Sequence, residues 1–362
     1  MIDFRYHVVS IVAIFLALTV GLVIGASILS GSLANSLRSD LSKANNQITG
    51  QQKQIQSLDN QIDQQNKYID DTAGQLVSGR LSGECIAMVQ LDGADTGSYS
   101  AMRTMLQKQA GAVLCSDTTV NATLTDPGSQ ATLSALLKEH TPAGQVLAGS
   151  VPEQAVELLA EALTTYQPTA VNLPSPGSTA TASSSPSPGS TGTAHPGAST
   201  GAGVGATTTV SPSVPATMNA SGALATLEDF QNAGMITMSS PPAASQQATL
   251  AYVQAPTGPG SDGDDAVSLA LVEALRKGGA GTVVGGSGQS ADRGGLVYAI
   301  INDATATREI STVDDSDTTM GQVASVFCLF DQSQGSTATV AGHYGTGTDN
   351  DGPIPPIAPG LG

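Results

Sequence analysis

The 362-residue chain is acidic, with 13 lysine and arginine residues against 30 aspartate and glutamate residues and a formal net charge of −17. The two signs balance up to Arg80, so the excess negative charge lies entirely in residues 81–362. A region with this charge repels phosphate backbones, which argues against nucleic acid as a partner and favours cations and basic surfaces.

The first predicted element is a membrane anchor at residues 8–29. These 22 consecutive residues are uncharged and mainly apolar. As a helix they extend about 33 Å, enough to cross a hydrocarbon core of about 30 Å. A cleaved signal peptide usually has a shorter apolar core, of about 7–15 residues, so retention as an anchor is the favoured interpretation. Basic residues are nearly balanced across the segment. We expect residues 1–7 to form a cytoplasmic tail and the rest of the chain to be exported.

A coiled-coil stalk is predicted at residues 33–77. The a positions are mostly isoleucine and some d positions are leucine, a pattern that favours a parallel dimer. Glutamine at two d positions lowers the stability of the coiled coil but helps to fix its register. Small residues repeat every four positions in the anchor, a spacing that lets membrane helices pack closely. The alternative is a lone helix folded back on the domain. The heptad positions are Leu41, Ile48, Ile55, Ile62, Ile69 and Leu76 at a, and Leu37, Ala44, Gln51, Leu58, Gln65 and Thr72 at d.

The region 82–343 alternates strand-like and helix-like segments. One βαβ pattern covers residues 84–115 and a second covers 250–285. The short match between AMVQ at 87–90 and AYVQ at 251–254 indicates an internal duplication. Strands that alternate with helices predict a mainly parallel sheet covered on both faces.

Two low-complexity segments complete the domain plan. Residues 168–215 are dominated by Ser, Thr, Pro, Gly and Ala, which predicts a disordered insertion in the exported domain because such a segment cannot form a core. Residues 345–362 are predicted to be a disordered tail. The expected fold class is a single N-terminal transmembrane helix and coiled coil followed by an α/β Rossmann-like domain.

Both ends of the chain resemble one family. The N-terminus MIDFRYHVVSIVAIFLALTVGLVIG, the heptads behind it, STVDDSDTTMGQVASVFCLFDQ at 311–332 and HYG at 343–345 resemble the actinobacterial MctB copper-transport family. The resemblance implies copper homeostasis at the cell envelope, with a part in copper efflux or transport. It carries over no set of metal ligands. The family also extends to cell-separation proteins of related architecture. The alternative function is therefore that of a non-enzymatic dimeric envelope scaffold that acts in cell-wall or cell-separation processes.

Copper is the metal that this resemblance implies, and Cu(I) sites use thiolate and thioether ligands. The candidate ligands are Cys85, Met88, Cys115, Met102 and Met105, with the Met235/Met238 pair as a further source. Core packing is the competing interpretation for methionines one helical turn apart and for cysteines among apolar neighbours. Cys328 makes the number of cysteines odd, which leaves open one disulfide and one thiol, or no disulfide.

Other patterns have structural explanations. GSGQSA at 286–291 satisfies the G-x-G-x-x-A pattern of dinucleotide sites, but Asp292 adds negative charge, so a turn without a nucleotide is favoured. The triplet Asp314, Asp315 and Asp317 lacks the glycine and distal glutamate of an EF-hand-like loop, which favours helix capping by Asp317 or Thr318. His140, His195 and His343 show no paired spacing, and no catalytic triad gathers in the sequence. We therefore expect no enzymatic activity.

Together these patterns predict a single-pass cell-membrane protein with an extracytoplasmic C-terminal domain. The expected partners are a second copy of the chain, bound through residues 33–77 and the anchor helix, together with the lipid bilayer and other envelope proteins. One membrane helix without intramembrane charge cannot form an aqueous path alone. A transport role therefore requires an oligomer or a partner.

Overall fold

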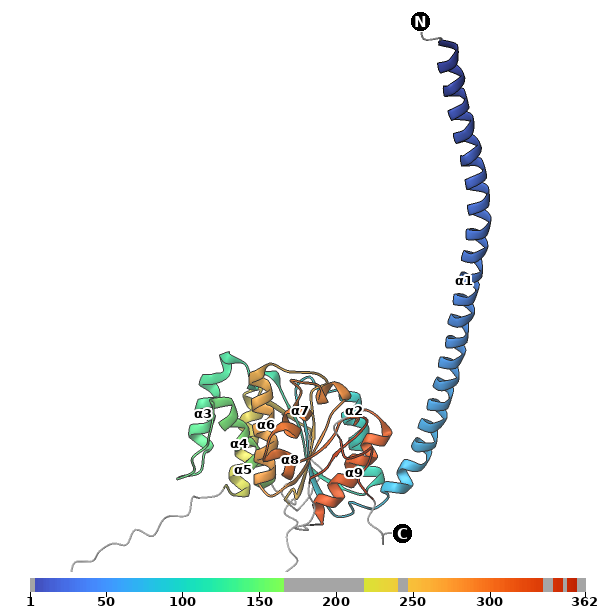
Figure 1. Ribbon diagram of the computed structural model, residues 1–362. Helices are drawn as coiled ribbons and strands as arrows, with labels where there is room; N and C mark the ends of the chain where they lie inside the picture. Colours follow the sequence, from blue (N-terminus) through green and yellow to red (C-terminus); the bar gives the residue numbers. More distant parts are fainter. Residues whose placement is uncertain (1–3, 166–217, 240–246, 335–340, 348–349, 357–362) are drawn as a thin grey trace, which may run out of the picture. The chain divides into compact units, whose positions relative to one another are not determined.

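The structure is a computed structural model that describes residues 4–165, 218–239, 247–334, 341–347 and 350–356 (Figure 1). Its contacts divide the chain into two units, Met1–Tyr68 and Ile69–Gly362. The predicted insertion at 168–215 lies outside the described residues.

The first unit is part of one continuous helix, α1, which runs from Phe4 to Val77. Its stretch Tyr6–Ala26 has a mean hydropathy of 2.8 and is long and apolar enough to cross a membrane. This stretch overlaps the predicted anchor. Beyond it, the leucine and isoleucine side chains at the heptad positions of this unit are at least half exposed in the single chain, namely Leu37, Leu41, Ile48, Ile55, Leu58 and Ile62.

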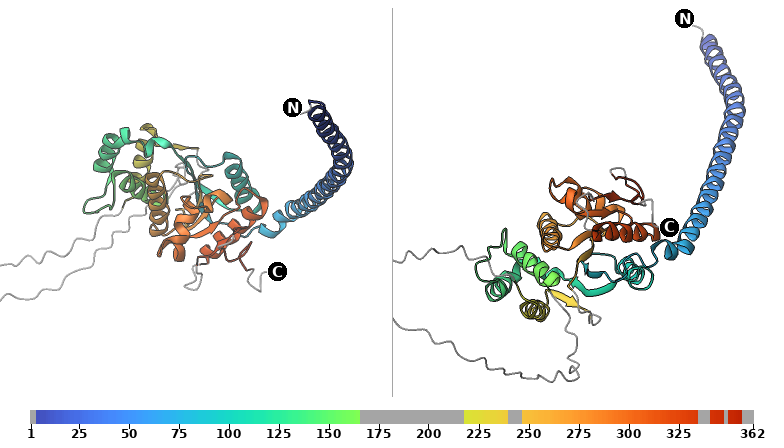
Figure 2. Two further views of the ribbon diagram at one scale, coloured as in Figure 1. Left: turned by 45° about the horizontal axis from the view of Figure 1, so that its top comes forward. Right: turned by 90° about the horizontal axis from the view of Figure 1, so that it is seen from below.

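The second unit, seen from two further sides in Figure 2, is built on a seven-stranded sheet with the order β3-β2-β1-β4-β5-β6-β7. Neighbouring strands are parallel except for β2 and β3, which are antiparallel. The mainly parallel sheet predicted from the sequence is therefore confirmed. The strands are β1 (Cys85–Gln90), β2 (Val113–Val120), β3 (Ile236–Met238), β4 (Leu250–Gln254), β5 (Gly281–Gly285), β6 (Ser311–Val313) and β7 (His343–Tyr344).

The two matching tetrapeptides lie side by side at the centre of this sheet. Residues 87–90 of β1 pair in parallel with residues 251–254 of β4, and Ala87 faces Ala251 while Gln90 faces Gln254. From this centre the chain moves outward in opposite directions, from β1 to β2 and from β4 to β5. Because crossovers between parallel strands have a fixed hand, the two connecting helices must cover opposite faces.

Helices cover both faces, as this rule requires. One face packs against α2 (Thr96–Thr104), the π-helical segment Met105–Gln109 that continues it, and α9 (Thr319–Ser333). The other face packs mainly against α4 and α6, with α3 and α5 beside α4 (Figure 1). The helices of this second layer are α3 (Gln130–His140), α4 (Val151–Thr165), α5 (Ala220–Asn232), α6 (Asp262–Lys277), α7 (Leu296–Asn302) and α8 (Ala306–Glu309). The central strands are buried on both sides, which explains their continuous apolar runs.

Side-chain caps begin several of these helices. Thr318 accepts a hydrogen bond from the amide of Gly321 at the start of α9. Asp95 does the same for the amide of Ser98 in α2, and Asn219 for Gly222 in α5. Such caps satisfy amides that have no partner inside the helix. Of the two predicted caps for α9, Thr318 is the one that the structure uses.

The base of α1 belongs to the second unit. Ala73, Val77 and Leu81 are buried in the same apolar cluster as α2 and α9, with Val77 and Leu81 fully buried. The guanidinium of Arg80 lies over the ring of Phe327, 4.5 Å from its centroid. The compact unit thus starts at Ile69, ahead of the expected boundary at residue 82.

Part of the expected C-terminal tail is folded. The amide of His343 donates to the carboxylate of Asp351 at 2.9 Å, and the amide of Gly345 donates to the carbonyl of Gly352 at 3.0 Å. Ile354 packs against the cluster that contains α9. Residues 350–356 therefore return to β7 and extend the domain.

Candidate functional site

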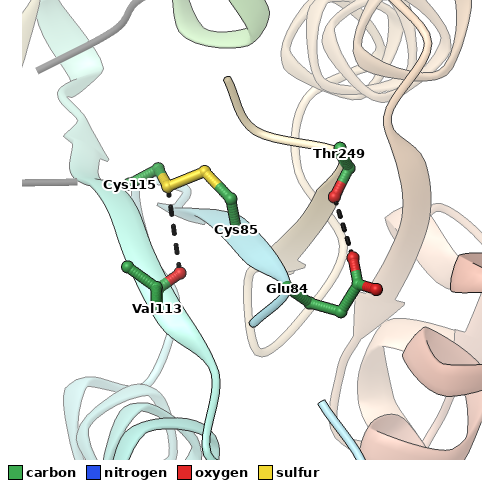
Figure 3. Close-up of a disulfide and its surroundings, with 5 residues drawn as sticks. All are labelled: Glu84, Cys85, Val113, Cys115 and Thr249. Atoms are coloured by element: carbon green, nitrogen blue, oxygen red, sulfur yellow. Dashed lines mark hydrogen bonds between the residues drawn. A yellow bond between two sulfur atoms is a disulfide. The ribbon is translucent and has the colours of Figure 1, made fainter. Parts of the chain in front are cut away.

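A disulfide joins two of the predicted copper ligands. Cys85 and Cys115 are bonded, with their Cα atoms 5.6 Å apart, and both are about 1% exposed (Figure 3). Cys115 lies at a bulge in β2, because Ile86 pairs with Leu114 and Ala87 pairs with Ser116. Cys115 is thus the extra residue of the bulge and has no partner in the register of β1. In this oxidised form neither sulfur is a thiolate, the form that binds copper.

The predicted methionine ligands lie on the other face of the sheet. Met88 and Met102 are fully buried and Met105 is 4% exposed, all in the cluster formed with α2 and α9. The disulfide instead packs with Ala87 and Ala248. The five candidates therefore do not form a single site in this structure, and copper binding by any of them stays a prediction.

Three further sulfur-containing side chains, those of Cys328, Met235 and Met238, also lie in packed surroundings. Cys328 is a free cysteine on α9, and burial raises the pKa of its thiol well above the ordinary value. A thiol that stays protonated is a poor metal ligand and nucleophile. Met235 is 1% exposed in the cluster around α4 and α6, and Met238 borders the same cluster.

An acidic crevice lies at the carboxyl edge of the sheet, where the strand order reverses between β1 and β4. This cavity of about 510 Å³ is lined by Asp95, Asp292 and Asp317, together with Gln254 and Gly288, and no lysine or arginine lines it among the residues that the structure describes. Open α/β sheets commonly bind ligands at this place. Hydrogen bonds from the hydroxyl and amide of Ser98 lower the pKa of Asp95, which favours its ionised form.

The glycine-rich turn contributes to this crevice without forming a phosphate cradle. After β5, Gly288–Ala291 form a single 3-10 turn, and α7 does not begin until Leu296. A dinucleotide site needs an α-helix that starts directly at the glycines and a region without negative charge. The interpretation without a nucleotide fits this geometry.

The three aspartates after β6 have separate structural roles. The carboxylate of Asp314 accepts hydrogen bonds from the amides of Thr346 and Gly347 at 2.8 and 3.0 Å, so it fastens the turn after β7. Burial, and then the charges of Asp314 and Asp317, raise the pKa of Asp315 to about 6. Asp317 lines the crevice. These side chains do not converge on one ion.

A buried polar network that the sequence did not indicate fastens α2 to the sheet. Asp117 on β2 is 5% exposed and accepts a hydrogen bond of 2.5 Å from the Tyr99 hydroxyl. Arg103 Nε lies 3.2 Å from the second carboxylate oxygen of Asp117. Burial, followed by the hydrogen bond from Tyr99 to Asp117, raises the pKa of the Tyr99 hydroxyl.

A group of metal-ligating side chains lies in the outer helices. Glu139 and His140 at the end of α3 and Asp229 on α5 offer one nitrogen and two carboxylate oxygens within 4.8 Å of one another. His140 and Asp229 are 89 positions apart in the chain, and their Nε2 and Oδ2 atoms are 2.9 Å apart. Sequence spacing alone could not have indicated this group.

Comparison with known proteins decides the family. The family model described as "Copper transport outer membrane protein, MctB" matches residues 1–355. The chain belongs to the MctB family. The resemblance seen at the two ends of the sequence is therefore confirmed, because the matched region includes α1 and the sheet.

Relatives named "Copper transporter MctB" from Mycobacterium bovis and Mycobacterium tuberculosis are each 24% identical to this chain over 348 residues. The alignments cover 96% of this chain and 97% of each relative. Membership of the MctB family, combined with the apolar stretch Tyr6–Ala26, indicates a membrane-anchored envelope protein.

Proposed function

We propose that this MctB-family chain acts in copper homeostasis at the cell envelope, in copper efflux or transport, as part of an oligomer. The observation that carries the proposal is the family match over residues 1–355. Two features agree with it. The helix α1 has a segment long enough to anchor the chain in a membrane, and the acidic domain attracts cations.

The proposed topology places residues 1–7 in the cytoplasm and the domain outside the cell membrane. The disulfide between Cys85 and Cys115 supports this orientation. Disulfides persist in oxidising compartments and are rare in the reducing cytosol. A domain with a buried disulfide between its neighbouring strands β1 and β2 therefore fits export.

The proposed oligomer forms through the stalk at 33–77. Isoleucine and leucine side chains at heptad positions, such as Ile55 and Leu58, are half exposed in the single chain, at 57% and 50%. Packing against a second copy would bury this stripe. The anchor has no charged residue, so conduction through the membrane would need several helices or a separate channel protein.

The proposed domain architecture is Rossmann-like, without a nucleotide and without catalysis. The first six strands follow the order 3-2-1-4-5-6 of that fold, with helices on both faces. The antiparallel pairing of β3 and the addition of β7 are departures from it. The carboxylates in the crevice disfavour phosphate groups, which is why we propose no nucleotide there.

Cellular copper content tests the proposed function. The gene is deleted in the host bacterium, and the copper content of the cells is measured by mass spectrometry. The deletion strain is then complemented with the full chain, or with a chain in which an unrelated membrane helix replaces residues 8–29. We expect the deletion strain to accumulate copper and the full chain to restore the normal content. Unchanged copper together with a defect in cell separation would overturn the proposal in favour of the dimeric scaffold. Cleavage of the domain by external protease in spheroplasts reports its orientation.

A further inference from the structure

We propose that Glu139, His140 and Asp229 form a binding site for a divalent transition metal, with Cu(II) as the preferred ion. The site would hold metal through one imidazole nitrogen and two carboxylate oxygens. The choice of copper rests on the proposed function, whereas the ligand set rests on geometry alone.

Packing fixes His140, and a neighbouring helix places Asp229 beside it. His140 follows Leu136 and Leu137 by four and three positions on α3, and both leucines are buried in the apolar cluster beside α4. Its side chain is only 9% exposed as a result. The side chain of Asp229 is 42% exposed, and its position on α5 is set by the fully buried Phe230 that follows it. The two ligands are therefore presented by neighbouring helices that pack on one core.

The observed separation suits coordination without movement of the helices. Metal ligand bonds to imidazole nitrogen and carboxylate oxygen measure about 2.0–2.2 Å. Two such ligands at a right angle are separated by about 2.9–3.0 Å, and opposite ligands by about 4.1 Å. The Nε2–Oδ2 distance of 2.9 Å is a hydrogen bond in the absence of metal, and it equals the separation of neighbouring positions in a tetragonal site, so a metal would replace the shared proton. The third ligand atom lies within 4.8 Å, and Glu139 is exposed and can turn inward.

The charge and the donor type favour Cu(II). Among the described residues no lysine or arginine forms an ion pair with Glu139 or Asp229. A cation would thus neutralise two carboxylates that share one place. Nitrogen and oxygen donors suit Cu(II) and Zn(II) better than Cu(I), and Cu(II) binds most tightly in the divalent series. The exposed side of Glu139 leaves positions for water and a path for entry.

Metal titration of the full-length protein in detergent tests the site. The protein is freed of metal with a chelator and titrated with CuCl₂ in the presence of glycine, which competes for weakly bound copper. Electron paramagnetic resonance then reports nitrogen coupling. We expect one Cu(II) per chain with imidazole coupling, and binding about 100-fold weaker in His140→Ala, because loss of outer partners alone typically costs 10–100-fold. Asp229→Asn and Glu139→Gln should weaken binding about 10-fold.

Matched controls separate this site from surface binding. Glu228→Gln changes an exposed carboxylate beside Asp229 on the same helix, and His7→Ala removes an exposed histidine in the N-terminal unit. Both should bind Cu(II) as the wild type does. Calorimetry of the metal-free variants confirms folding, and His140→Gln replaces His140→Ala if the latter unfolds. Unchanged affinity and coupling after loss of His140, or binding of ZnCl₂ without CuCl₂, overturns the proposal.

The outcome is distinct from that of the cellular experiment. Normal copper content in the deletion strain with intact Cu(II) binding would refute the proposed function and keep the site. Copper accumulation on deletion without Cu(II) binding at His140 would keep the function and refute the site.

Discussion

Replacing Cys85 and Cys115 with alanine removes the covalent link between β1 and β2. The two cysteines are 30 positions apart. Closing a loop of that length removes conformational entropy from the unfolded chain worth about 3–4 kcal/mol at 25 °C. For a unit of this size, we expect the double variant to lower Tm by about 5–10 °C in scanning calorimetry of the detergent-solubilised chain.

Cys328→Ala provides the matched control. Cys328 is also buried and is a free thiol, so its replacement measures the loss of a packed sulfur without the loss of a cross-link. Alkylation after unfolding should label one cysteine per chain without reductant and three after reduction. Three labelled cysteines without reductant, or a double variant as stable as Cys328→Ala, would refute the reasoning.

Three further predictions concern the second unit and the stalk. Because burial raises the pKa of Asp315 to about 6 from 3.8, its ionised form is disfavoured in the folded state. Stability should therefore fall by about 2–3 kcal/mol as pH rises from about 4 to above 6. Asp315→Asn should remove that slope in urea titrations, and an unchanged slope would contradict the assignment. Leu81→Ala should lower the free energy of unfolding by about 2–5 kcal/mol because Leu81 is fully buried. The exposed control Leu76→Ala should change it by less than about 0.5 kcal/mol, and equal losses would count against a core that includes the base of α1. Oxidation of Ile55→Cys should give a covalent dimer in membranes, whereas Lys53→Cys at an outer heptad position should give little, and monomer alone from Ile55→Cys would refute the parallel coil.

Long buried strands were readable from the sequence, and short edge strands were not. The apolar runs that became β1, β4 and β5 stand out because both faces of each strand are covered. In contrast, the edge strands β3 and β7 have only three and two residues and no period to detect. The helices from α3 to α5 were not singled out either. They insert between β2 and β3, where no strand alternation indicates them.

The bulge in β2 explains why the polar contacts could not be inferred. Regular alternation would direct Asp117 and Cys115 to the same face of the sheet. The shift between Ile86 and Ala87 instead pairs Asp117 with Met88, on the face covered by α2. One extra residue reverses the facing of every later side chain. Tyr99 and Asp117 meet for that reason, and no spacing in the sequence shows it.

The base of α1 determines what proteolytic shedding would release. A protease that cuts the exposed helix ahead of Ile69 would free a domain that keeps Ala73, Val77 and Leu81 in its core. A cut just after Leu81 would leave these side chains on the membrane stump and expose the apolar surfaces of α2 and α9. Intact release and destruction of the domain are thus separated by the short segment between Ile69 and Leu81, which spans the last turns of α1 and the turn that follows it.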